Sequence, residues 1–124
     1  MKFSTRTVTG HGRGRKLGFP TINMLIPENV PLFMQQGVYA ARAVVKGQKY
    51  EGALYYGPAP TFDQKEVALE IYLLDTVNFY IGEGEIVDVE VLKFIRPVMT
   101  FDIPDLLVIQ MQKDEDVIRT VLRR

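Results

Sequence analysis

The chain has 124 residues, a formal net charge of zero, and 47% hydrophobic and 24% charged side chains. These values are typical of one globular domain with a buried core, and the balanced charge excludes a chain-wide attraction to nucleic acid or to a membrane surface. The absence of cysteine excludes disulfides, thiolate catalysis and zinc–cysteine sites. No apolar run approaches the roughly 18 residues of a membrane span, and the first residues lack the apolar segment of a signal peptide. We therefore expect one cytoplasmic domain over residues 1–124.

A β-branched stretch over residues 4–10, STRTVTG, predicts a strand that leads into a glycine-rich basic segment. That segment, residues 10–23, reads GHGRGRKLGFPTIN, and no acidic residue precedes Glu28. Its spacing matches neither the P-loop nor the dinucleotide-binding fingerprint. Glycine N–H groups can nevertheless converge on an anion, and Arg15 and Lys16 add positive charge. By itself the segment fits a phosphate site and a flexible basic turn about equally.

The residues that follow the basic segment alternate and predict a short strand. Thr21 and Asn23 are two positions apart, so their side chains point to the same side of such a strand. Both carry neutral oxygens, and Mg²⁺ commonly takes a few protein oxygens and completes its shell with water and phosphate. The alternative is that Thr21 only starts the strand and Asn23 faces water.

Further along the chain, turn signals separate short strands. Residues 27–31, PENVP, indicate a turn or loop, and residues 37–57 predict a hairpin that turns at residues 46–48. Residues 67–75 and 85–95 predict two more strands, the latter with its valines alternating onto one face. About six strands without intervening helices favour an antiparallel barrel, because closure protects the strand edges.

Glu70 stands in the apolar strand VALEIYLLD and shares a face with Ala68, Tyr72 and Leu74. A carboxylate in such a strand either lies at the mouth of a barrel or is costly to bury. A carboxylate shielded from water is the better proton acceptor near neutral pH, which suits a general base. The alternative is a surface glutamate paired with a lysine.

The period changes at the end of the chain, where a helix is expected over residues 103–123. Asp102 is a candidate N-cap and Pro104 a favoured first helical residue. The charged run at residues 113–116 leaves open whether there is one helix or two. Apolar side chains at helical spacing form a stripe that we expect to pack across the barrel: Leu107, Met111, Ile118, Val121 and Leu122.

Taken together, these motifs resemble those of the riboflavin kinase family, in the family's order and over nearly the whole chain. GHGRGRKLGFPTIN resembles the glycine loop and the GFPTAN motif, and GPAPTF (residues 57–62) resembles the G-x-x-P-T-F turn. LEIYLLD (69–75) resembles the strand of the catalytic glutamate, and FIRPVMTF (94–101) the segment before the terminal helix.

The resemblance implies a six-stranded antiparallel Greek-key β-barrel, about residues 1–101, followed by a C-terminal helical segment, about 103–123. It also implies Mg²⁺- and ATP-dependent phosphorylation of the riboflavin 5′-hydroxyl, which gives FMN and ADP. In bacteria this domain is usually the C-terminal half of a bifunctional FAD synthetase. We accordingly expect a monomeric kinase domain, standalone or excised, with no nucleic-acid or membrane partner.

The resemblance also assigns roles to individual residues. Glu70 would be the general base, and Thr21 and Asn23 would bind Mg²⁺. Arg96 and Phe101 would contact the flavin. The ATP contacts would be Gly10, Gly12, Arg15, Lys16, Gly18, Leu73, Asp75 and Tyr80.

Three departures from the family pattern leave a second hypothesis open. Tyr55 and Tyr56 replace the usual asparagine–isoleucine, Ile81 replaces a glycine after Tyr80, and Met99 replaces a polar residue. The alternative is a flavin- or nucleotide-binding barrel, a sensor or carrier, with impaired catalysis. An RNA-binding barrel is disfavoured because the basic residues are confined to one end and the net charge is zero.

Overall fold

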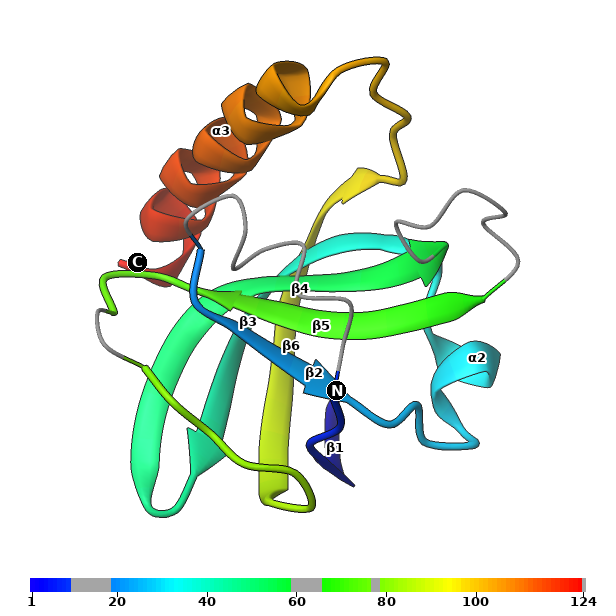
Figure 1. The fold of residues 1–124 in the computed structure, drawn as a ribbon, viewed down its shortest axis with the longest axis vertical. Helices are drawn as coiled ribbons and strands as arrows, with labels where there is room; N and C mark the ends of the chain where they lie inside the picture. Colours follow the sequence, from blue (N-terminus) through cyan, green and yellow to red (C-terminus); the bar gives the residue numbers. More distant parts are fainter. Residues whose placement is uncertain (10–18, 59–65, 77–78, 124) are drawn as a thin grey trace.

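The computed structural model describes residues 1–9, 19–58, 66–76 and 79–123, and the structural statements below concern these residues (Figure 1). They form six strands and two helices: β1 (Lys2–Arg6), β2 (Thr21–Met24), α2 (Val30–Phe33), β3 (Gly37–Val45), β4 (Gln48–Pro58), β5 (Val67–Leu73), β6 (Ile86–Pro97) and α3 (Pro104–Leu122). No helix among the described residues is both long and apolar enough to cross a membrane.

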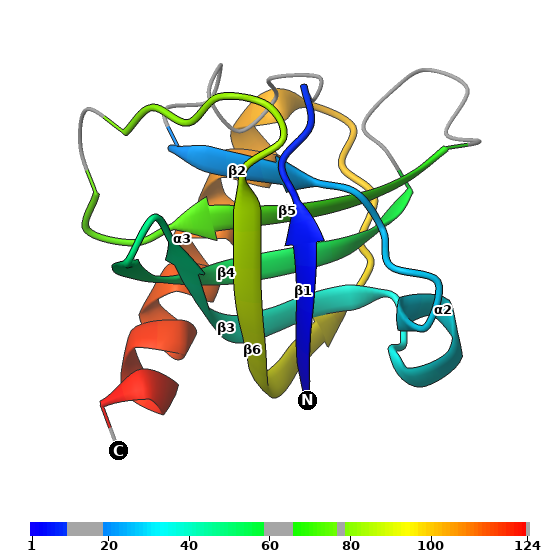
Figure 2. The same cartoon turned by 90° about the horizontal axis from the view of Figure 1, so that it is seen from below.

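The six strands form one antiparallel sheet in the order β1-β6-β3-β4-β5-β2. The sheet curls until its two outer strands approach each other, as Figure 2 shows from below. A bridge between Thr7 and Met24 joins them, and the amide of Val8 donates to the Asn23 carbonyl at 2.9 Å. The expected six-stranded antiparallel barrel with a C-terminal helix is confirmed.

The strand register follows from the hydrophobic pattern and from one tight turn. Val87 and Val89 are buried, which confirms the alternation predicted for β6. Lys46 and Gly47 adopt φ values of 50° and 76° and close the β3–β4 hairpin where it was predicted. Such a turn matches the right-handed twist of the strands it joins. The barrel interior is filled by apolar side chains from all six strands, among them Phe3, Ile22, Leu54, Leu69, Ile71 and Val87.

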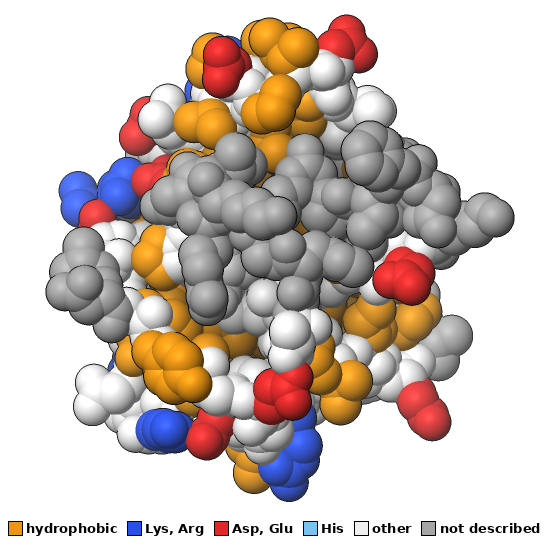
Figure 3. Space-filling model, in the orientation of Figure 1, with side chains coloured by type: hydrophobic (Ala, Val, Ile, Leu, Met, Phe, Trp, Pro, Cys, Tyr) orange, Lys and Arg blue, Asp and Glu red, His pale blue; other side chains and the backbone are white. Residues whose placement is uncertain are grey.

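Helix α3 lies outside the barrel, across β3, β4 and β6 (Figure 1). Ile118 is fully buried in a second apolar cluster with Val38, Ala40, Ala53 and Leu74. The helix also carries apolar side chains that face solvent, since Leu106, Ile109 and Val117 are exposed. Orange side chains gather at the top of Figure 3, where α3 begins in the same view of Figure 1. The side of α3 that packs against the barrel is the predicted stripe, which includes the buried Met111 and Ile118.

One local expectation was wrong, and two others are now resolved. Asp102 is not the N-cap of α3: the helix begins at Pro104, and Ile103 occupies the cap position in an extended conformation with no side-chain cap. Proline presets the backbone angle of a first helical residue, so it fixed the helix start one residue later than a cap at Asp102 requires. Of the two possibilities left open for residues 113–116, the structure shows the first: they lie within a single helix, with Asp114 buried. Residues 28–29 form the expected turn, and α2 then begins at Val30, again with a proline in the first turn.

Candidate functional site

Strands β2 and β5 bring three of the predicted residues together. Thr21 lies opposite Tyr72, and Asn23 lies opposite Glu70. Directly opposed residues of an antiparallel pair have Cβ atoms about 5 Å apart. Ile22 and Ile71, which alternate with these residues, are fully buried in the barrel. The polar side chains therefore share the outer face of the sheet.

Glu70 is the buried acid at the centre of this group. Its side chain is only 3% exposed, and its Oε2 accepts a hydrogen bond of 2.9 Å from the Tyr72 hydroxyl. Tyr55 of β4 lies opposite Glu70 on the other side of β5. Of the alternatives left open for Glu70, a surface glutamate is therefore excluded. Tyr72 was not among the predicted site residues, although its spacing of two from Glu70 placed it on the same face of the strand.

Thr21 and Asn23 form a set of neutral oxygen donors beside Glu70. The Thr21 hydroxyl donates to the Phe19 carbonyl at 2.9 Å, which leaves its oxygen lone pairs available as acceptors. Asn23 is half-buried. Among the described residues there is no cluster of three or more His, Cys, Asp or Glu that could hold a metal. The side-chain oxygens of Thr21 and Asn23 suit a hard cation such as Mg²⁺, whose remaining ligands would be oxygens of water or of a bound phosphate.

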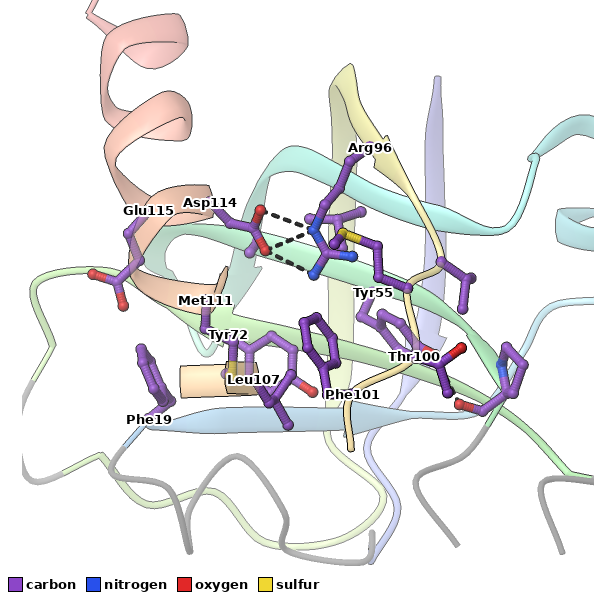
Figure 4. A pocket seen from close by; sticks show the side chains of 15 residues that line it. Phe19, Tyr55, Tyr72, Arg96, Thr100, Phe101, Leu107, Met111, Asp114 and Glu115 are labelled. Carbon is purple, nitrogen blue, oxygen red and sulfur yellow. Dashed lines mark hydrogen bonds and ion pairs between the residues drawn. The ribbon is translucent and has the colours of Figure 1, made fainter. Parts of the chain in front are cut away.

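A pocket opens between the outer face of the sheet and α3 (Figure 4). Its lining is mainly apolar and aromatic: Phe19, Tyr55, Tyr72 and Phe101 contribute rings, and Val38, Val98, Met99, Leu107 and Met111 contribute aliphatic or thioether groups. Tyr72 connects this pocket to the carboxylate, because its ring lines the pocket and its hydroxyl binds Glu70. The arrangement suits a flat aromatic ligand whose polar end reaches the acid.

Arg96 is held at the pocket by an acid from the helix. Its Nε and Nη2 each donate to the Asp114 carboxylate at 2.9 Å, and its Nη1 donates to the Pro97 carbonyl at 3.1 Å. The side chains of Arg96 and Asp114 are 12% and 5% exposed. Sequence reasoning missed Asp114, although the position lies on the inward stripe between Met111 and Ile118.

The remaining predicted residues are distributed as follows. Phe101 lines the same pocket as Arg96, so the two proposed flavin contacts are brought together. The Leu73 side chain lies in the barrel core, Asp75 follows β5 with φ 52°, and Tyr80 is 84% exposed. The predicted phosphate contacts Gly10, Gly12, Arg15, Lys16 and Gly18 lie outside the described residues.

Asp75 is tied to the far half of α3. Arg119 donates to its carboxylate at 2.8 Å from Nη2 and also contacts Glu115 at 3.4 Å. The hydrogen bond from Arg119 lowers the pKa of Asp75, and the same bond raises the pKa of Arg119. Burial raises the pKa of Glu115, although the nearby Arg119 opposes this shift. The ionised form of Glu115 is thus disfavoured by folding.

This shift predicts a pH-dependent gain in stability for Glu115→Gln. Between the unfolded pKa of Glu115 and its raised folded pKa, the folded protein binds more protons, so its stability falls as pH rises through that window. We expect Glu115→Gln to melt at a higher temperature than the wild type at pH 7, and the difference to disappear below the unfolded pKa. Melting temperatures across pH 3.5–7.5 measure this. Asp116→Asn on the exposed face is the control and should show no such convergence, and a constant offset for Glu115→Gln would contradict the assignment.

Comparison with known proteins agrees with this fold and site. A family model described as riboflavin kinase matches residues 1–122. The chain is 34% identical over 116 residues to a bifunctional riboflavin kinase/FMN adenylyltransferase of Listeria monocytogenes, covering 91% of this chain and 36% of that protein. It is 30% identical over 115 residues to the human riboflavin kinase, covering 88% of this chain and 72% of the human protein.

A solved structure shows the same fold. The riboflavin kinase of Trypanosoma brucei superimposes with a TM-score of 0.67 at 24% identity, covering 99% of this chain and 81% of that one. The structure is therefore that of a flavin-kinase-type barrel with its C-terminal helix. The chain belongs to the riboflavin kinase family. It spans about a third of the length of the bifunctional bacterial relatives from Listeria and Haemophilus.

Proposed function

We propose that this domain transfers the γ-phosphoryl group of ATP to the 5′-hydroxyl of riboflavin, giving FMN and ADP. One observation carries the proposal: a buried carboxylate, Glu70, accepts a hydrogen bond from Tyr72, which lines an aromatic pocket, and the strand paired with it carries two neutral metal-type ligands, Thr21 and Asn23. Membership of the riboflavin kinase family supports the same reaction.

The pocket would bind the flavin ring. The isoalloxazine system is flat, aromatic and uncharged, and the rings of Phe19, Tyr72 and Phe101 offer it apolar surfaces and edges. The described charged residues of the lining are Arg96, Asp114 and Glu115, which gives no excess of positive charge that would favour an anion. The ribityl chain would then run past Tyr72 towards Glu70.

Glu70 would act on the reacting hydroxyl. Its carboxylate accepts the proton of the riboflavin 5′-hydroxyl as the O5′–P bond forms and the bond between the γ-phosphorus and the ADP oxygen breaks. Tyr72 orients the carboxylate by donating to Oε2. Low exposure at Glu70 keeps water from competing as the nucleophile.

Thr21 and Asn23 would hold Mg²⁺, because they offer neutral oxygens and lie on the strand paired with that of Glu70. When bound, the cation neutralises phosphate charge. By resemblance to the family, the phosphates would lie on Gly10, Gly12, Arg15, Lys16 and Gly18, with further nucleotide contacts from Leu73, Asp75 and Tyr80.

The test is to incubate the protein with riboflavin, ATP and Mg²⁺ and to separate the flavins by chromatography. We expect conversion to FMN in step with ADP release, and loss of both when EDTA is added. Tight binding of riboflavin without FMN would refute the kinase proposal and favour the sensor or carrier hypothesis.

A further inference from the structure

Arg96 enters the pocket with most of its hydrogen-bonding capacity already used. A guanidinium has five N–H donors in a fixed plane. Each of the three nitrogens of Arg96 makes a bond: Nε and Nη2 to Asp114, and Nη1 to the Pro97 carbonyl. Two donors, one on each Nη, are therefore left by these bonds. They lie on the terminal nitrogens that Figure 4 shows between Asp114 and Phe101.

Asp114 is itself fixed from two sides. It projects inward from α3 with its side chain 5% exposed, and Gln110, one turn earlier, donates from Nε2 to Oδ1 at 3.0 Å. A carboxylate is costly to bury unless an opposite charge and hydrogen bonds compensate it. Arg96 and Gln110 supply both. The pair spans the interface between β6 and α3, so the helix determines where the guanidinium lies.

The pairing also changes what Arg96 can recognise. An isolated guanidinium would attract an anion, whereas a guanidinium bound side-on to a carboxylate is locally neutral and offers two directed N–H groups. Such a group suits a carbonyl oxygen at the edge of an uncharged ring. The ring carbonyls of a flavin have this chemistry.

We infer that Asp114 is a positioning residue: through its bidentate bond it orients Arg96 so that the guanidinium binds the carbonyl edge of the flavin ring. The inference rests on the proposed function, because it takes the flavin as the occupant of the pocket. The hydrogen bonds of Asp114 go to Arg96 and Gln110, which have no assigned part in phosphate binding or in proton transfer. Its loss therefore weakens binding of the ring and leaves ATP binding and the chemical step in place.

The test compares Asp114→Asn with Asp116→Asn. Both variants remove one negative charge from α3, but the Asp116 side chain is 84% exposed and is not part of the described lining of the pocket. For Asp114→Asn we expect the KM for riboflavin to rise about tenfold, which is the scale of a lost hydrogen bond to a charged group. The KM for ATP and kcat should stay within about twofold of the wild type, and Asp116→Asn should leave all three unchanged.

A second variant covers the case in which Asp114→Asn does not fold. Gln110→Met keeps the length of the side chain, the helix propensity and the charge of Asp114, but removes the donor that holds Oδ1. We expect the KM for riboflavin to rise by about twofold to threefold, in the same direction, in a variant that circular dichroism shows to be folded. An unchanged KM for riboflavin in every variant that folds, or an equal rise for riboflavin and ATP, overturns the inference.

Binding of lumichrome separates this inference from the proposed function. Lumichrome carries the ring carbonyls but has no ribityl chain and no hydroxyl to phosphorylate, so fluorescence titration reports ring binding alone. We expect its Kd to rise by the same factor as the riboflavin KM in Asp114→Asn. If the wild type makes no FMN but lumichrome binding still depends on Asp114, the kinase proposal fails and the positioning role stands. If FMN forms but the Kd of lumichrome is the same in the wild type and in Asp114→Asn, the positioning role fails and the kinase proposal stands.

Discussion

Glu70→Gln is expected to lower kcat for FMN formation by about 10²–10⁴-fold, because a positioned general base contributes a factor of this size. Glutamine has nearly the same shape and still offers an oxygen to the Tyr72 hydroxyl, but it cannot accept the proton of the substrate. The KM values for riboflavin and ATP should change little, since the ring pocket and the two metal-type ligands are untouched. Steady-state kinetics over a range of both substrates measures the effect.

The matched control for this prediction is Glu51→Gln. Glu51 lies on the neighbouring strand β4, is exposed, and pairs with Arg42 at 3.1 Å on the surface. It should retain the wild-type kcat, and circular dichroism should show that both variants are folded. A Glu70→Gln enzyme with wild-type turnover would remove Glu70 from the role of general base.

Gly52→Ala is expected to lower the free energy of unfolding by about 3 kcal/mol, at the upper end of the usual cost of overpacking. A Cβ at this position would lie 2.2 Å from the backbone oxygen of Tyr72 and 3.0 Å from Cγ1 of Ile71. Backbone cannot move aside as a flexible side chain does, so strands β4 and β5 would have to separate. We also expect lower activity, because β5 carries Glu70 and Tyr72.

Urea unfolding measures this change as a lower midpoint with an unchanged slope. Gly82→Ala is the control: a Cβ there meets nothing within 4 Å, so the midpoint should stay close to that of the wild type. Equal midpoints for Gly52→Ala and Gly82→Ala would contradict the close approach of the two strands.

The local features of the fold could be read from the sequence. The alternation of valines in β6 and of apolar residues in β5 can be seen in the sequence, and it identifies side chains that the structure buries. Lys46 and Gly47, which have positive φ values, form the turn between β3 and β4. The order in which the strands pair was accessible only through the family resemblance. Pairing depends on contacts between distant parts of the chain, which local periodicity does not encode.

For the site too, some residues could be predicted from the local sequence and others could not. Glu70 was found because a single acid in an apolar strand requires an explanation, and Tyr72 could have been found by the same spacing argument. Asp114 was hidden in a charged run, where an acid is usually solvated. Its burial depends on Arg96, eighteen positions away, and the partner of a buried charge cannot be identified from either segment alone.

The pairing of β2 with β5 has a practical consequence for preparing this protein. Slipping one strand by a single residue would exchange its two faces, so Asn23 would no longer oppose Glu70, and Ile22 would leave the interior. The correct register between β2 and β5 is therefore needed both to bury Ile22 and to place Asn23 opposite Glu70. Specific activity per milligram should therefore serve as a quality measure for refolded material. We expect chains with a shifted β2–β5 register to be weakly active even when they are monodisperse, and a second round of refolding to recover turnover and thermal stability together.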